Sequence, residues 1–236
     1  MNVAINGPEI LGYLFGNTSL PITETMRNSW IIMAFFLCIF LTRRMEKIPK
    51  GKQALAEKAV LMIDGLVDST MGEGCRAFSP YIMTLMMSSL FGSLASLFWM
   101  RSTTADLNTT LGWAIITFIL ITYNKIKFGG IKGYLKGFLE PIFVMAPLNV
   151  LSEIATPVSM SFRHFGNMAG GLVITTLIMG ALKVLSNAVL GFLPVPLLQI
   201  GLPGVLSLYF DCFTACMQAF IFSMLTMAYV GDARGS

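Results

Sequence analysis

Long apolar stretches alternate with short polar ones along the whole chain. The stretches with the polarity of membrane-inserted helices lie at 28–42, 78–100, 109–123, 141–186 and 204–230, and we expect the short helix at 28–42 to continue into its polar flanks. A membrane-spanning helix needs about 20 predominantly apolar residues, and the strands of a membrane barrel would instead alternate apolar and polar positions. We therefore predict an all-α integral membrane protein, 1–236, with about five membrane-inserted helices in one domain.

The segment 53–70 has a different pattern from these stretches. Its apolar residues recur at helical spacing, and its polar residues occupy another face of the same helix, which predicts an amphipathic helix on the cytoplasmic membrane surface. The apolar positions are Leu55, Ala59, Met62, Ile63 and Leu66, and the polar ones are Gln53, Glu57, Asp64 and Asp68. A helix packed on the bundle is the alternative interpretation.

The stretch 141–186 is twice as long as an ordinary span. As one helix, the 42 residues between Glu140 and Lys183 alone would extend roughly 60 Å, whereas the hydrocarbon core is ~30 Å thick. It is either two spans or one strongly tilted helix. Because Pro157 predicts only a kink and no cluster of turn residues interrupts the stretch, we favour one tilted helix.

Composition agrees with a membrane protein. The 236 residues are 55% hydrophobic and only 12% charged, with a mean hydropathy of +0.74, whereas soluble domains are about a quarter charged. The net charge of +4 comes largely from basic clusters beside the predicted spans, so it does not indicate nucleic-acid binding. The first residues lack a basic start followed by an apolar run, so we expect no cleavable signal peptide.

The basic clusters also predict topology. They follow the spans 28–42 and 109–123, and the positive-inside rule assigns both to the cytoplasm. Segment 1–27, an irregular stretch or a short interfacial helix, is then external, and the C-terminus is cytoplasmic. The clusters are Arg43, Arg44, Lys47, Lys50 and Lys52, and, in an expected inner loop, Lys125, Lys127, Lys132 and Lys136.

Two helices each carry a stripe of groups that lipid would reject. On the long helix the stripe is Asn149, Glu153, Thr156, Arg163, Asn167 and Gly170, and on the last helix it is Ser207, Asp211, Thr214 and Gln218. Such stripes must face each other, water or another protein. An arginine is effectively never deprotonated in a protein, and at the centre of a membrane helix it costs about 2.5–3.5 kcal/mol.

Two interpretations of these stripes stay open at this point. In the first, the stripes hold the two helices together, with Arg163 and Asp211 as a buried ion pair. In the second, Arg163 is a fixed positive charge, and Glu153 and Asp211 carry or relay a cation. In that case the small residues near Arg163 allow another helix to approach closely. These small residues are Ser159, Ser161, Gly166, Ala169, Gly170 and Gly171.

Other polar or reactive residues give weaker signals. His164, the single histidine, is a candidate proton relay, but it points about 100° away from Arg163 on a helix. The serines between 88 and 96 indicate either close helix packing or a water-lined face. We expect no metal site, disulfide or cofactor, because the cysteines lack ligand spacing and are typical of small buried hydrophobes. They are Cys38, Cys75, Cys212 and Cys216.

Three segments of the chain resemble subunit a of F-type ATP synthases. PVSMSFRHFGNMAGG at 157–171 resembles the signature around the essential arginine of that family, and MQAFIFSMLTMAYV at 217–230 resembles its final helix. TADLNTTL at 104–111 is also similar to family sequence. The resemblance covers nearly the whole chain.

The resemblance implies a non-catalytic stator channel for H+ or Na+ in a bacterial plasma membrane, in which the long tilted helix at 141–186 and the last helix at 204–230 form a hairpin. Its partners would be a rotating ring of c subunits, the b subunits of the stator stalk and membrane lipid. Arg163 would lie between two offset half-channels, with Asn167 and Gln218 as polar residues near it. From the pattern of polar residues we expect Asn149 and His164 to be further supporting polar groups.

The sequence departs from the family pattern at two positions. Some members have a carboxylate where this chain has Leu172, and a histidine where it has Asp211. We therefore expect Asp211 to serve one half-channel, and Glu153 is the weaker candidate. The alternatives from other classes are a secondary transporter with Arg163 as an anion site and a structural membrane anchor. We find no inverted repeats that favour the transporter, and an anchor leaves the stripes unexplained.

Overall fold

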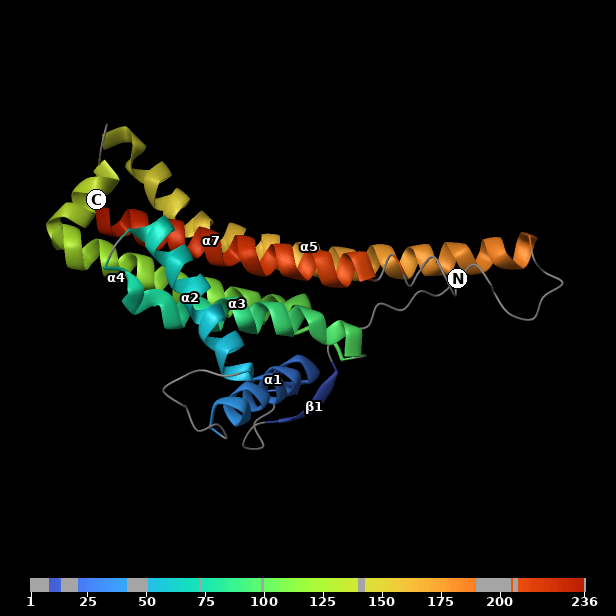
Figure 1. The fold of residues 1–236 in the computed structure, drawn as a ribbon. Helices are drawn as coiled ribbons and strands as arrows, with labels where there is room; N and C mark the ends of the chain where they lie inside the picture. Colours follow the sequence, from blue (N-terminus) through green and yellow to red (C-terminus); the bar gives the residue numbers. More distant parts are fainter. Residues whose placement is uncertain are drawn as a thin grey trace.

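The computed structural model describes residues 9–13, 21–41, 51–72, 74–98, 100–139, 143–189, 205 and 208–235. Its main elements are helices, arranged as an elongated bundle (Figure 1). The α-helices are α1 (Glu24–Leu41), α2 (Lys52–Met71), α3 (Ser79–Leu94), α4 (Leu107–Leu139), α5 (Ala146–Val189) and α7 (Thr214–Gly235). Short 3₁₀ segments are η2 (Arg76–Phe78), η3 (Ala95–Phe98), η4 (Thr103–Ala105) and η5 (Phe143–Met145), and η7 (Leu208–Phe213) is a π-helix.

The predicted all-α membrane fold is confirmed. Four helical stretches of the described residues are long and apolar enough to cross a membrane, namely Arg76–Phe98, Leu107–Leu139, Ala146–Ser186 and Asp211–Arg234. Helix α1 covers most of the first predicted span. The predicted basic cluster at 43–50 and most of the predicted loop at 187–203 lie outside the described residues, but 187–189 belong to α5.

The long helix α5 runs beside α7 along the molecule (Figure 1). It is a single helix of 44 residues with Pro157 inside it, and at 1.5 Å per residue it spans about 66 Å. The ~30 Å hydrocarbon core accommodates a helix of this length only when the helix is strongly tilted. Only 6% of the most apolar stretch of α5 is buried, against 44% for α7. Helix α5 is therefore a peripheral helix with an open outer face.

Helix α7 forms the centre of the bundle, because it packs against α2, α3, α4 and α5. Near the end of α7 that carries Arg234, Met227 joins a buried cluster with Ile63 and Val67 of α2 and Ile82 of α3. In the middle of the bundle, Phe222 packs against Leu85, Ala114 and Met160. Helices α2, α3, α4 and α7 each bury apolar side chains in these clusters, which fixes the rotation of each helix about its own axis.

Helix α2 packs on the bundle through part of its apolar face. Ile63 and Val67 are buried, but the predicted apolar position Met62 is 59% exposed. The polar face bonds to the following segment: Asp68 Oδ2 accepts from Arg76 Nη2 at 2.7 Å, and Asp64 accepts a hydrogen bond from Ser79. The alternative interpretation, a helix packed on the bundle, therefore describes the face of α2 that carries Ile63 and Val67.

The basic segment after 124 is helical, so the prediction of a loop there was wrong. Helix α4 continues to Leu139 and is broken only at Gly130, whose φ of 70° is a left-handed conformation that glycine adopts without a steric penalty. Because the segment remains helical, its lysines occupy fixed faces of α4. The end of the bundle that carries this segment is called the basic end below, and the opposite end, with η4, is called the η4 end.

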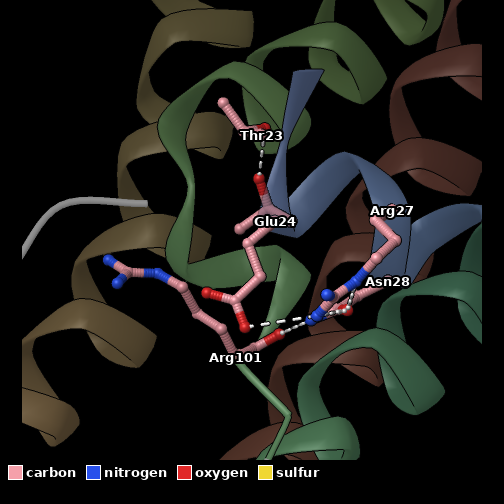
Figure 2. A network of polar contacts seen from close by, with 6 residues as sticks. Thr23, Glu24, Arg27, Asn28 and Arg101 are labelled. Carbon is pink, nitrogen blue, oxygen red and sulfur yellow. Dashed lines mark hydrogen bonds and ion pairs between the residues drawn. The ribbon is translucent and has the colours of Figure 1, made fainter. Parts of the chain in front are cut away.

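The N-terminal segment forms a hairpin, where the sequence predicted an irregular stretch or a short helix. Strands β1 (Ile10–Tyr13) and β2 (Pro21–Thr23) pair antiparallel and lead directly into α1. Figure 2 shows how this region is fastened: the Arg27 guanidinium contacts Glu24 and Asn28, and Asn28 Nδ2 donates to the Arg101 carbonyl at 3.0 Å. Thr25 also donates to Asp106 at 2.8 Å. These contacts join α1 to the loop after α3.

The serine-rich face of α3 is packed against other parts of the protein. Ser89 and Ser93 are fully buried, and Ser93 Oγ lies 2.8 Å from Thr104 Oγ1 of η4. A Cβ added to Gly92 would overlap the Thr103 hydroxyl. Small residues thus allow η4 to lie directly on α3, as the packing interpretation of this stripe predicts.

Candidate functional site

Arg163 lies on the open face of α5, within an apolar helix. The residues beside it on this face are also exposed, including Phe162 at 53% and Asn167. Arg163 makes no hydrogen bond or ion pair with any other residue that the structure describes, Asp211 included. The interpretation of Arg163 and Asp211 as a buried ion pair is therefore not supported. A charged side chain on an apolar surface requires a partner from outside this chain, or water.

The opposite face of α5 is fixed by buried polar contacts. Ser161 Oγ lies 3.1 Å from Thr110 Oγ1 of α4, and His164 Nε2 lies 3.2 Å from Ser89 Oγ of α3. The His164 ring also makes edge-on contacts with Trp113 and Phe222. These contacts hold α5 in one rotation, and in that rotation Arg163 faces outward.

Small residues next to Arg163 leave room on the same face. Cβ atoms added to Gly166 and Gly170 would meet no other atom within 4 Å. The predicted set of small residues is divided, because Ser161 is buried against α4 while Ser159 and Gly166 are exposed. The open face of α5 therefore combines one cation, an exposed amide at Asn167 and a shallow backbone surface that a helix can approach closely.

Glu153 lies in a cavity of about 740 Å³ between α4, α5 and α7 at the basic end. Its Oε1 atom is 2.9 Å from Lys125 Nζ, so the carboxylate forms an ion pair across α4 and α5. Glu153 precedes Arg163 by ten residues, which is about 15 Å along a helix. Glu153 and Arg163 therefore belong to different parts of α5, and the ion pair of Glu153 is with α4.

Asn149 lies on the same cavity wall as Glu153. Its side-chain amide donates to the Phe138 carbonyl at 3.0 Å. Phe138 is close to the end of α4, so this bond ties the start of α5 to the basic end. Asn149 thus lines the cavity and does not lie beside Arg163.

Asp211 lies in the π-helix η7 at the start of the last helix, and its side chain is half-buried. Seven residues on, Gln218 is 7% exposed. A π-turn contains more residues than an α-turn, so the seven-residue spacing does not place Asp211 and Gln218 on one face as it would in a regular helix. The prediction of a continuous polar stripe through both residues assumed α-helical geometry throughout, and that assumption was wrong.

Sequence reasoning missed Lys125 as a member of the site. Lys125 stands in a basic run that predicts a cytoplasmic loop, and no local pattern connects it with Glu153, 28 residues further along the chain. It also missed the polar anchors Ser89 and Thr110. The spacing of serines on α3 indicated a packed face, but it did not indicate which helix would occupy that face.

Comparison with known proteins gives a consistent result. The sequence profile of the family described as ATP synthase A chain matches residues 26–231. The chain is 32% identical to the sodium-ion-specific ATP synthase subunit a of Propionigenium modestum, over 93% of this chain and 77% of that protein. It is 33% identical to ATP synthase subunit a of Moorella thermoacetica, over 90% of this chain and 91% of the relative. The corresponding subunit of Desulforamulus reducens is 34% identical, over 89% and 78%.

Proposed function

Because the chain belongs to the ATP synthase A chain family, we propose that Arg163 acts on ion-carrying carboxylates of a ring of c subunits that rotates past α5. As a member of this family the chain is a non-catalytic, ion-channel subunit of the membrane sector. It is a multi-pass protein of the bacterial plasma membrane, and it works with the other membrane-sector subunits of the complex.

The observation that carries this proposal is the exposure of Arg163 on an apolar helix without a partner among the described residues. A guanidinium keeps its charge at any physiological pH. Unpaired in lipid it would be costly, and a carboxylate from a neighbouring chain removes that cost. The glycines beside Arg163 support a helical neighbour, because they leave the backbone of α5 accessible.

The charge of Arg163 provides the mechanism. A ring carboxylate that approaches the guanidinium is stabilised in its ionised form, so it releases the ion it carries. It can bind an ion again only after it has moved beyond Arg163. The same fixed charge repels free cations and prevents direct leakage past the ring. Arg163 thereby couples ion transfer to movement of the ring.

Two access routes follow from the positions of the remaining polar groups. The cavity at the basic end, with Glu153 in its wall, is the proposed cytoplasmic route, because the positive-inside rule assigns the lysines of the basic end to the cytoplasm. Asp211, near the opposite end of α7, is the proposed group of the external route. With this orientation the N-terminus is external and the C-terminus is cytoplasmic.

The translocated ion is H+ or Na+, and one relative is named as sodium-ion specific. The carboxylates Asp211 and Glu153 suit either ion, since oxygen ligands bind both protons and hard cations. The b subunits of the stator stalk are further proposed partners in the complex.

Disulfide cross-linking tests the contact with the ring. In a variant without the native cysteines, Gly166→Cys is oxidised together with a ring cysteine placed next to the ring carboxylate. We expect an efficient cross-link, because position 166 is open. Ser161→Cys is the matched control, since this side chain is buried against α4 and should not react. Cross-linking at 161 but not at 166 in an active complex would contradict the proposed ring contact.

A further inference from the structure

The cavity at the basic end is lined by other charged side chains besides Glu153. In the described part of the chain its walls carry three charged side chains, Lys125 from α4, Glu153 from α5 and Asp232 from α7. Neutral oxygen-bearing side chains complete the lining, including Tyr134, Ser152 and Thr156. Carboxylate and hydroxyl oxygens are the ligands that hard monovalent cations accept.

The Lys125 ammonium contacts one of these oxygens directly. Its Nζ atom is 2.9 Å from Glu153 Oε1, and the Glu153 side chain is only 12% exposed, compared with 35% for Lys125. The carboxylate is thus mostly removed from water while the ammonium remains partly hydrated. A mostly buried carboxylate needs a cation near it, and in this structure Lys125 supplies that cation.

The position of the ion pair distinguishes it from a contact that only fastens two helices. It lines a cavity, and the same wall includes Gly129, Gly133 and Gly137. Cβ atoms added to these glycines would meet nothing within 4 Å, so there is open space along this part of the wall. The flexible stem of a lysine with this much space can move its ammonium away from Glu153 and back.

We propose that the Lys125 ammonium occupies a monovalent-cation site on Glu153, and that each permeating ion passes this point by displacing it. This inference rests on the proposed function, in which the cavity is the cytoplasmic route. The ligand class is a proton or a small monovalent cation. Lys125 is a positioning residue in this scheme, because it competes with the ion for Glu153 and does not carry the ion.

The competition has a consequence for the transport rate. A mostly buried carboxylate without a counter-charge would retain a bound cation, because release of the cation would leave the carboxylate unpaired. The ammonium replaces the departing ion and so prevents the carboxylate from becoming a trap. Removal of Lys125 alone should therefore be more harmful than removal of Lys125 and Glu153 together.

The test uses the complete ATP synthase in membrane vesicles. ATP-driven proton uptake and radioactive sodium uptake are measured for Lys125→Met, Glu153→Gln and the double variant, and ATPase activity retained on washed membranes reports assembly. Lys132→Met is the matched control, because Lys132 is an exposed lysine of the same helix outside the cavity lining. We expect Lys125→Met to pump about tenfold more slowly, the double variant to recover to within about threefold of the wild type, and the control to be unchanged.

Either of two results would overturn the inference: wild-type pumping by Lys125→Met, or a double variant no faster than that single variant. If Lys125→Met does not assemble, Glu153→Gln is compared with the double variant. We then expect Glu153→Gln to be the slower of the two, because it leaves an ammonium without a counter-charge in the cavity, and equal rates would contradict the inference. Arg163→Ala in the same series separates the two proposals. If Arg163→Ala abolishes pumping and Lys125→Met does not affect it, the proposed function stands and only the inference about Lys125 is contradicted.

Discussion

His164 and Arg163 are adjacent in sequence, but one side chain is buried in the bundle and the other is exposed on the open face of α5. The His164 ring is fully buried against α3, α4 and α7, whereas the Arg163 side chain is exposed on the outer face. The contacts of the buried His164 fix the rotation of α5 about its axis, and in this rotation Arg163 is exposed. The order Arg-His therefore places a buried packing residue and an exposed charge at consecutive positions.

Replacement of His164 by leucine separates packing from proton relay. The ring makes one hydrogen bond, through Nε2, and its buried Nδ1 atom has no partner among the described residues. Loss of one such bond costs about 1 kcal/mol, and leucine fills much of the same space. We expect His164→Leu to assemble and to pump within about twofold of the wild type. Loss of pumping in an assembled His164→Leu complex would instead favour a proton relay.

Gly92→Val tests the close packing of η4 on α3. A Cβ at this position overlaps the buried Thr103 hydroxyl, so a larger side chain must displace the Thr103 side chain or η4 as a whole. We expect a loss of stability of about 1–3 kcal/mol, measured as a lower thermal midpoint of the purified complex. Gly112→Val is the control, because a Cβ there meets nothing within 4 Å. An equal effect of both substitutions would mean that β-branching in a helix, and not overlap, causes the loss.

Asp211→Asn should impair ion transport more than Glu153→Gln. Glu153 is already neutralised by Lys125, whereas Asp211 stands in the π-helix where the external route is proposed. We expect pumping to fall at least about tenfold for Asp211→Asn and only about two- to fivefold for Glu153→Gln. Pumping rates normalised to assembled complex provide the measurement. The reverse order would make Glu153 the main ion-carrying group of this chain.

Much of the helical fold could be predicted from the sequence, because a membrane imposes a length and a polarity on each span. The family resemblance derived from 157–171 and 217–230 is confirmed by the comparisons. The outward position of Arg163 and the inward position of His164 agree with the predicted angle of about 100° between consecutive residues in a helix. Local periodicity was sufficient for these features, since each depends on one helix.

Other features depend on geometry that no local pattern contains. The basic run around Lys125 follows the positive-inside rule whether it is a loop or a helix, so the sequence did not distinguish them. The π-helix around Asp211 changes the rotation of every residue before it, and spacing rules assume a constant turn. Strand β1 has only four residues, too few for a reliable alternation signal. The Lys125–Glu153 pair joins two helices, and its discovery required their packing.

The central claim is that Arg163 serves a passing carboxylate of another chain, and Arg163→Ala tests it most directly. ATP-driven ion uptake is measured in vesicles, with assembly checked by membrane-bound ATPase activity. We expect normal assembly, because Arg163 makes no hydrogen bond or ion pair with the described residues, together with complete loss of ion uptake. Uptake at the wild-type rate in an assembled Arg163→Ala complex would contradict the claim.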